Sequence, residues 1–143
     1  MTLLFMHDRE VIEFVSRMLW PDGEGAFEEN ARAIGCLDRQ NRLIAGGVYH
    51  NWNPANGTIE LSFAATTPRW ATQSAVSGFL AYPFLDCGCQ MIVSVVSENN
   101  YRVRKLLSGV GFKHHIISRL YGKDEAGVIY TLTDDDWQSG RYF

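Results

Sequence analysis

Two polar side chains within one strand-like segment are the clearest candidates for chemistry in this sequence. In Thr58–Ala65 apolar residues alternate with Glu60, Ser62 and Ala64, and the period of two of a β-strand puts Glu60 and Ser62 on the same face. A carboxylate in this position can accept a proton from a neighbouring nucleophile. The alternative is a glutamate on an exposed strand face that forms a cross-strand pair. For Ser62, a small polar residue is favoured over a relay for water.

The histidine and cysteine patterns do not indicate a metal site. His114 and His115 are adjacent in a strand-like segment, so their side chains point to opposite faces. Cys87 and Cys89 lack the second pair of ligands that a zinc site needs. Small buried cysteines at a helix–strand junction explain them better, and no metal is expected.

The composition is that of one soluble globular domain spanning residues 1–143, with 46% hydrophobic and 20% charged residues. The net charge of −3 gives no general affinity for nucleic acid, and no apolar run approaches the ~20 residues of a membrane span. We therefore expect neither nucleic acid nor membrane as a partner. The three cysteines and a start unlike a signal peptide predict reduced thiols and a cytoplasmic location.

The stretch Gln90–Phe112 combines a strand, a polar turn and a basic helix. Met91–Val96 is a nearly unbroken apolar run, typical of a strand buried on both faces between parallel neighbours. Ser97–Asn100 interrupts it with turn-forming residues. The helical period then places on one face the apolar side chains Val103, Leu106, Leu107 and Val110, and on the other the basic side chains Arg102, Arg104 and Lys105. Gly109 and Gly111 supply stop signals for the helix, and Phe112 returns to the core.

The remaining chain predicts an alternation of short strands and helices in the order β-α-α-β-β-β-α-β-α-β-β. Asp8 caps an amphipathic helix that ends near Trp20, and an acidic second helix is predicted at Glu24–Arg32. The expected strands are Thr2–Met6, Ile34–Leu37, Leu43–His50, Thr58–Ala65, Met91–Val96, His115–Tyr121 and Val128–Leu132. A long helix should follow the loop Thr66–Arg69 and run to about Asp86, and Trp137 in the acidic tail should be a structural plug.

This succession resembles the GNAT family of N-acetyltransferases over essentially Thr2–Leu132. The strand, the Asn100-to-Gly111 spacing and the basic helix are most similar to the branch that includes ribosomal-protein N-terminal acetyltransferases. Arg69-Trp70, Tyr82-Pro83-Phe84 and His50-Asn51-Trp52 resemble compact GNAT-like proteins of phages and prophages. The resemblance implies an α/β fold with a mixed central sheet of six to seven strands. Parallel strands 4 and 5 would splay apart in that sheet, which four helices would flank.

The resemblance also implies acetyl-CoA as the co-substrate. Its pantetheine arm would pair with the backbone near Phe63–Thr66, and its pyrophosphate would lie on the amides that open the next helix. The implied cofactor-binding residues are Phe63, Ala64, Ala65, Thr66, Arg69, Trp70, Ala71, Thr72, Gln73, Ser74, Asn100 and Arg104. For Asn100 the alternative is a plain helix N-cap. For Arg102 and Arg104, a solvated helix face is favoured for at least one of the two.

One segment departs from the family pattern. The usual phosphate loop contains two small or glycine positions, whereas Pro68–Ser74 has no glycine, and Trp70 stands at or next to one of them. The hydroxyls of Thr72 and Ser74 and the charge of Arg69 are expected to compensate in part. The alternative is a degenerate loop that binds no CoA.

The resemblance assigns the role of general base to Glu60, and Ser62, on the same strand face, is the second candidate catalytic residue. The tyrosine that many members use as general acid aligns with Leu107, so the usual acid is absent. The helices after the first strand flank the acceptor groove in the family. The expected substrate-binding residues are therefore Phe27, His50, Trp52 and Tyr121, each with core or surface packing as the alternative.

Two functions of different kinds follow. The first is an acetyl-CoA-dependent N-acetyltransferase that moves an acetyl group to a primary amine of a small molecule or protein, by direct attack in a ternary complex. The second is a catalytically degenerate binding module, of phage origin, that acts through a protein partner; the missing glycines and tyrosine motivate it. Many relatives pair as dimers, so a homodimer is also an expectation.

Overall fold

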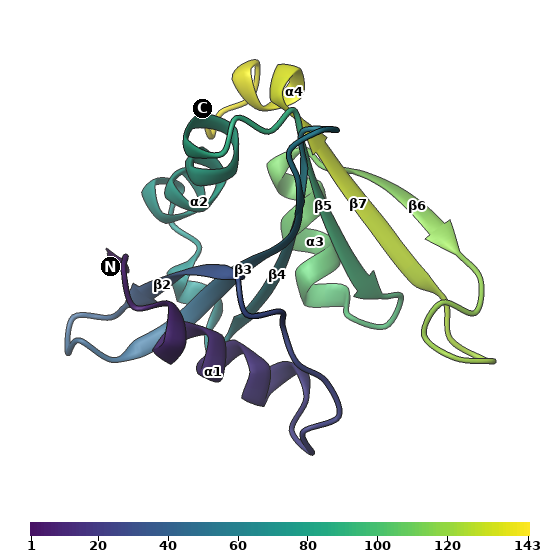
Figure 1. The fold of residues 1–143 in the computed structure, drawn as a ribbon, viewed down its shortest axis with the longest axis horizontal. Helices are drawn as coiled ribbons and strands as arrows, with labels where there is room; N and C mark the ends of the chain where they lie inside the picture. Colours follow the sequence, from purple (N-terminus) through teal and green to yellow (C-terminus); the bar gives the residue numbers. More distant parts are fainter.

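The computed structural model describes residues 1–143, which form one seven-stranded sheet with helices on both faces (Figure 1). The strands are β1 (Thr2–Leu4), β2 (Arg32–Leu37), β3 (Leu43–Asn53), β4 (Thr58–Ala65), β5 (Met91–Ser97), β6 (Lys113–Ile117) and β7 (Gly127–Thr133). The helices are α1 (Asp8–Leu19), α2 (Gln73–Ala81), α3 (Tyr101–Val110) and α4 (Asp134–Gln138), with a 3₁₀ turn η1 (Pro68–Trp70) and a π turn η2 (Tyr82–Asp86). None of the helices has the length and apolarity that a membrane span requires.

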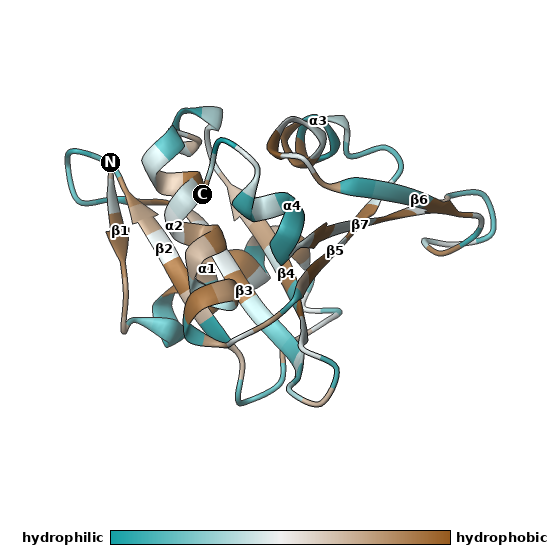
Figure 2. Cartoon of the chain, turned by 90° about the horizontal axis from the view of Figure 1, so that it is seen from above, coloured by the Kyte–Doolittle hydropathy of each residue, from teal (hydrophilic) through white to brown (hydrophobic).

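The strand order is β1-β2-β3-β4-β5-β7-β6, and every neighbouring pair is antiparallel except β4 and β5. This confirms the predicted mixed α/β sheet in which strands 4 and 5 are parallel. The expectation of parallel neighbours on both sides of Met91–Val96 is wrong, because β7 is antiparallel to β5. Seen from above, the sheet spreads from β4 and β5 into a part that carries β1–β3 and a part that carries β7 and β6 (Figure 2).

Two adjacent glycines in β3 allow helices to approach the sheet closely on opposite faces. A Cβ atom on Gly46 would lie 2.8 Å from side-chain carbons of Val11 and Val15, which belong to α1. A Cβ on Gly47 would lie 3.1 Å from the Phe79 ring of α2. Since consecutive strand residues face opposite ways, α1 and α2 cover opposite faces of β3, and the two glycines leave room for each.

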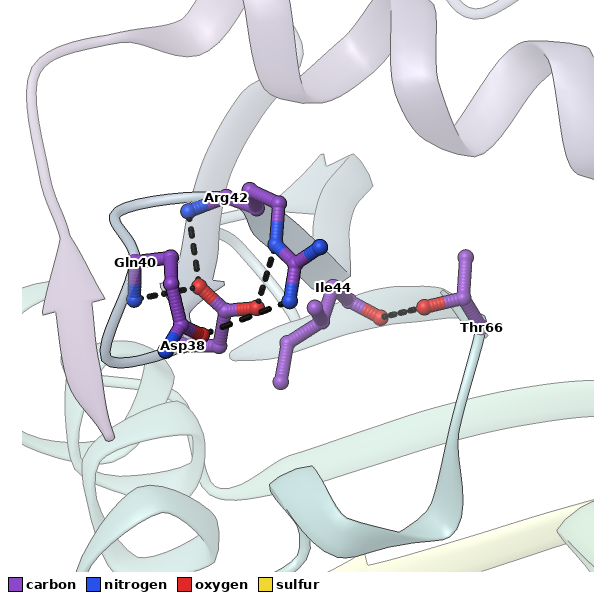
Figure 3. A network of polar contacts seen from close by, with 5 residues as sticks. All are labelled: Asp38, Gln40, Arg42, Ile44 and Thr66. Carbon is purple, nitrogen blue, oxygen red and sulfur yellow. Dashed lines mark hydrogen bonds and ion pairs between the residues drawn. The ribbon is translucent and has the colours of Figure 1, made fainter.

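The β2–β3 hairpin is fixed at its tip by one carboxylate. Asp38 accepts hydrogen bonds at 2.9 Å from the backbone N–H groups of Gln40 and Arg42 and from the Arg42 Nε (Figure 3). The Arg42 amide, then its guanidinium and the Gln40 amide, hold the pKa of Asp38 below its usual value. Figure 3 also shows the Thr66 hydroxyl donating to the Ile44 carbonyl, which ties the end of β4 to β3.

The predicted second helix at Glu24–Arg32 is wrong. Residues 21–31 form turns and irregular chain, and β2 already begins at Arg32. The Trp20 ring lies directly over Gly25, where a Cβ would be 2.3 Å from a ring atom. The segment therefore folds around an aromatic side chain instead of forming helical turns.

Other element boundaries also differ from the prediction: β1 ends at Leu4 and not at Met6, and β3 continues beyond His50 to Asn53. The long helix after β4 begins only at Gln73 and changes to a π turn at Tyr82, because Pro83 supplies no N–H for a continued α-helix. The strand expected at His115–Tyr121 lies at Lys113–Ile117 and is followed by turns. The acidic tail forms the short helix α4, whose buried Trp137 confirms the predicted plug.

Trp137 should contribute strongly to stability. Its ring stacks on Phe84 at 4.7 Å and meets Phe143 edge-on at 4.8 Å, while its buried Nε1–H has no acceptor. We expect Trp137→Ala to lower the free energy of unfolding by about 3–5 kcal/mol. Trp137→Phe keeps the stacking and removes the unpaired donor, so it should cost less than about 1.5 kcal/mol. Urea unfolding measures both, and equal losses would contradict this packing role.

Candidate active site

The pairing of β4 with β5 stops after three residue pairs. Thr58, Ile59 and Glu60 are aligned with Met91, Ile92 and Val93, and no pair follows. Beyond that point the Ser94 hydroxyl donates to the Leu61 carbonyl at 2.7 Å, in place of a backbone ladder bond. The outer edges of both strands remain paired with β3 and β7 over their length. The two strands therefore part toward their C-terminal ends, as predicted.

The gap exposes backbone groups of β4 that have no strand partner. The Leu61 carbonyl points toward β5, whereas the Thr66 amide donates to Ile44 of β3. Because backbone groups alternate in direction along a strand, those of Phe63 and Ala65 also point toward β5, where the pairing has ended. An extended ligand with amide groups can therefore pair with β4 here.

A cavity of about 810 Å³ is centred on this gap. Its lining residues come from both sheet faces: one set lies on the end of α1, the 21–31 segment and β3, the other on α2 and α3. The cavity thus gives two ligands that enter from opposite faces of the sheet a common meeting point between β4 and β5.

Two carboxylates meet at Asn51 on the first of these faces. The Asn51 backbone N–H donates to the Glu28 Oε2 at 2.6 Å, and its side-chain Nδ2 donates to the Glu60 Oε1 at 3.0 Å. The hydrogen bond from the Asn51 backbone N–H lowers the pKa of Glu28, so Glu28 is ionised at neutral pH. Asn51 thereby holds Glu60 and Glu28 at one edge of the cavity.

Asn51 adopts a left-handed backbone conformation, with φ of 52°. It lies in β3 where the register to β4 shifts between His50 and Asn53. Asparagine tolerates this conformation better than most residues. The irregularity turns both donors of Asn51 toward the carboxylates, so the strand distortion builds the site.

His50 is the buried member of the cluster, with 8% of its surface exposed. Its Nε2 shares a hydrogen bond of 2.8 Å with the Ser62 Oγ and lies 3.7 Å from the Glu60 Oε2. Burial lowers the pKa of His50, and the nearby Glu60 and Glu28 only partly oppose this effect. The imidazole is therefore neutral at pH 7, so its contact with Glu60 is not an ion pair.

The glycine-free loop directs its largest side chain into the core. Trp70 is 5% exposed, and its ring lies 4.4 Å from Phe63 and 5.5 Å from Phe79 between centroids. It consequently forms part of the cavity wall and does not cover the outside of the loop. Thr72, Gln73 and Ser74, in contrast, are exposed.

The start of α2 offers two free backbone donors. The Thr72 side chain caps the helix by accepting from the Ala75 amide, and the Val76 amide donates to the Thr72 carbonyl. The amides of Gln73 and Ser74 have no acceptor, as expected at a helix N-terminus. Together with the helix dipole they form a favourable position for an anion.

The basic side chains near this position separate into two groups. Arg69 is exposed on η1, and Arg102 lines a smaller cavity of about 120 Å³ between α3 and the loop, together with Ala65 and Ala71. The Arg104 side chain instead donates to the Tyr130 hydroxyl and the Glu98 carbonyl. Arg104 therefore braces α3 against β7 and lies outside both cavity walls, whereas Arg102 lies in one.

The other predicted residues are placed as follows. Asn100 lines the large cavity and also caps α3 through the Val103 amide at 3.4 Å. Phe27 and Tyr121 also line the large cavity, and the Tyr121 hydroxyl donates to the Val95 carbonyl at 3.2 Å. Ala64 is buried in the smaller core beneath α1. Trp52 does not line the cavity and lies beside the Cys89 thiol.

Sequence reasoning did not single out Asn51 or Trp20 as residues of this site, and it noted Glu28 only as one of three acidic residues, with Glu24 and Glu29, near the acceptor groove. Asn51 became part of it only through the register shift in β3, which leaves no trace in the residue pattern. The sequence pattern predicts Glu28 within a helix at Glu24–Arg32 and Trp20 at the end of the first helix, and neither prediction places a side chain in a cavity. The one available signal was the Asp22–Gly25 stretch, whose two glycines are unfavourable within a helix.

Solved structures with this fold include acetyltransferases. The chain is similar to a point mutant of the spermidine N-acetyltransferase SpeG from Vibrio cholerae (14% identity, 96% of this chain and 97% of that chain, TM-score 0.75). A chimera of that enzyme with hSSAT matches at 13% identity over 96% and 99% of the two chains, with a TM-score of 0.77. A dodecameric structure of the Vibrio cholerae enzyme matches at 15% identity over 77% and 68%, with a TM-score of 0.64.

No protein-family model matches the sequence, and no curated protein matches it. The likeness therefore concerns the three-dimensional arrangement of the chain, which the spermidine acetyltransferase structures share over nearly its whole length. The chain has the GNAT fold.

The burial of His50 predicts a loss of stability in acid. The unfolded chain binds a proton on His50 near pH 6.5, whereas the folded chain binds it only at lower pH. Protonation therefore favours unfolding, and stability that is present above pH 6.5 decreases as the pH falls below it. His50→Gln should flatten this part of the stability–pH curve measured by urea unfolding. His115→Gln, on the exposed strand β6, is the control, and an equal effect of both changes would contradict the assignment.

Proposed function

We propose that this protein is an acetyl-CoA-dependent N-acetyltransferase. One observation carries the proposal: the cavity between the parted strands β4 and β5 joins unpaired backbone on one side to the Glu60 carboxylate on the other. An acyl donor that pairs with β4 and an amine that enters beside Glu60 would meet in this gap. The similarity of the fold to spermidine N-acetyltransferases supports the same reaction class.

The residues around the gap fit the parts of acetyl-CoA, which supplies an acetyl group activated as a thioester. The Phe63 and Ala65 backbone groups would pair with the amides of the pantetheine arm. The Gln73 and Ser74 amides would hold the pyrophosphate, and Arg69 on η1 and Arg102 on α3 would supply positive charge. A backbone N–H of β4 in the gap would stabilise charge that develops on the thioester oxygen.

The acceptor amine would attack the acetyl carbon directly in a ternary complex. The N–C bond forms, the C–S bond breaks, and CoA leaves as the thiolate. Glu60 takes the proton that the amine loses, because Glu60 lines the cavity and Asn51 occupies only its Oε1. His50, as a neutral imidazole, shares a hydrogen bond with Ser62 and lies beside Glu60. Leu107 lines the cavity where many relatives carry a tyrosine, so the thiolate leaves without that acid.

A binding module without turnover is the second candidate. It is favoured by the glycine-free loop and by the buried Trp70, which packs where a glycine-containing loop would have no side chain. Acetyl-CoA binding without acetyl transfer to any amine would support this candidate. It would act through a protein partner, with the amine-binding face as the contact surface.

The first test concerns Glu60. Glu60→Gln keeps an acceptor oxygen for Asn51 but removes the base, so we expect kcat to fall about 10²- to 10⁴-fold. Acetyl-CoA affinity measured by calorimetric titration should not change, since Glu60 lies on the amine side of the gap. Unchanged turnover in Glu60→Gln would contradict the role of Glu60 as the base. Absence of turnover in the unsubstituted protein would favour the binding module.

The second test concerns the anion position at α2. Gln73 is the first residue of the helix, where proline fits, and Thr72 before it has an extended conformation that proline also permits. Gln73→Pro removes one free amide donor, whereas Gln73→Ala removes only the side chain. We expect Gln73→Pro to bind acetyl-CoA about tenfold or more weakly than Gln73→Ala, as is typical for a lost bond to a charged group. Equal affinities would show that phosphate does not bind there.

A further inference from the structure

We infer that the acceptor is a primary amine with a single positive charge, an apolar part about the size of an aromatic ring, and no carboxylate. This inference rests on the proposed function and adds the chemical class of its acceptor. It depends on the charge of the amine-binding face, on the absence of cationic side chains around the cavity, and on the aromatic wall beside Glu28.

The amine-binding face carries concentrated negative charge. Glu28 and Glu60 each use one oxygen to accept from Asn51, at 2.6 and 3.0 Å, which leaves the other oxygen of each available. No lysine or arginine lies within 4.0 Å of either carboxylate, and the adjacent His50 is neutral. Two adjacent anions without a partner attract an ammonium group. Glu60 can then accept the proton that the ammonium group must lose before its nitrogen attacks, and the second proton passes to the departing CoA thiolate as the amide forms.

The other residues that line the cavity limit the number and the sign of the charges that the acceptor can carry. Glu28 and Glu60 are the only acidic residues among the 28 that line the cavity, and none of the 28 is lysine or arginine. A second ammonium group, as in a polyamine, would therefore lie against uncharged side chains. A carboxylate on the acceptor would lie near two anions with no cation to bind it, which disfavours amino acids.

The wall next to the carboxylates is aromatic. Trp20 and Phe27 pack with ring centroids 5.0 Å apart, and Phe27 meets His50 edge-on at 4.9 Å. Leu120 and Tyr121 also line the cavity and are 47% and 45% exposed. Gly25 permits the Trp20 ring to lie against the backbone of the 21–31 segment, which fixes the ring at the cavity edge. Such a surface favours a flat apolar body beside the ammonium group.

Four amines test this inference in one acetyl-transfer assay with acetyl-CoA. The reference is 2-phenylethylamine, which has one amine and one aromatic ring. L-Phenylalanine differs from it by a carboxylate, ethylamine lacks the aromatic ring, and spermidine carries additional positive charges. We expect kcat/KM for 2-phenylethylamine to exceed that of each of the other three about tenfold or more. Higher or equal kcat/KM for spermidine or L-phenylalanine would overturn the acceptor class and leave the N-acetyltransferase proposal standing. Acetylation of none of the four would overturn both.

Variants identify the residues responsible. Trp20→Ala should raise KM for 2-phenylethylamine about tenfold and leave ethylamine almost unaffected. Leu120→Ala, on a different segment, serves as a second variant should Trp20→Ala unfold. Glu28→Gln should raise KM for both amines because it removes one anion but keeps an acceptor for Asn51.

The matched control is Phe5→Ala, which removes an exposed aromatic side chain outside the cavity. An unchanged preference in both Trp20→Ala and Leu120→Ala would refute the aromatic wall as the specificity element.

Discussion

The end of parallel pairing between β4 and β5 is the constraint on which the rest of the structure depends. A central sheet normally satisfies every backbone group of its inner strands, and leaving such groups unpaired in the interior is costly. Here β3 and β7 hold the outer edges of the two strands, while the Ser94 hydroxyl satisfies the Leu61 carbonyl where the strands part. The cost is thus confined to a few groups of β4. These groups face a cavity in which a ligand with amide groups can satisfy them.

A second local distortion organises the opposite face of the gap. The register shift in β3 puts Asn51 into a left-handed conformation, and from there its two donors reach Glu28 and Glu60. Backbone in such a sparsely populated region persists only when the surroundings stabilise it, and it is frequent at functional sites. The same irregularity therefore brings together residues from a loop, β3 and β4, and it leaves their negative charge without a neighbouring cation.

The loop without glycine shows how one anion position can form in a different way. Glycines in such loops let phosphate approach the backbone closely. In this protein the bulky side chain at Trp70 turns inward, where it packs between Phe63 and Phe79, and the Gln73 and Ser74 amides at the start of α2 stay exposed and unpaired. The start of α2 therefore lacks the conformational freedom that glycines would give, but it keeps its backbone N–H donors. The ring also gives the cavity a rigid wall on the side of α2.

Much of the fold was determined by the sequence alone, because local periodicity carries it. The alternation in Thr58–Ala65, the apolar run at Met91–Val96 and the helical spacing after Asn100 predicted β4, β5 and α3 with errors of at most one residue. The common face of Glu60 and Ser62 also follows from the strand period, and both line the cavity. The tertiary structure decided the rest: the irregular path of residues 21–31 around Trp20, the inward turn of Trp70, and the approach of Glu28 to Glu60 through Asn51. These features arise from contacts between residues far apart in the chain, and no local pattern of residue types encodes such contacts.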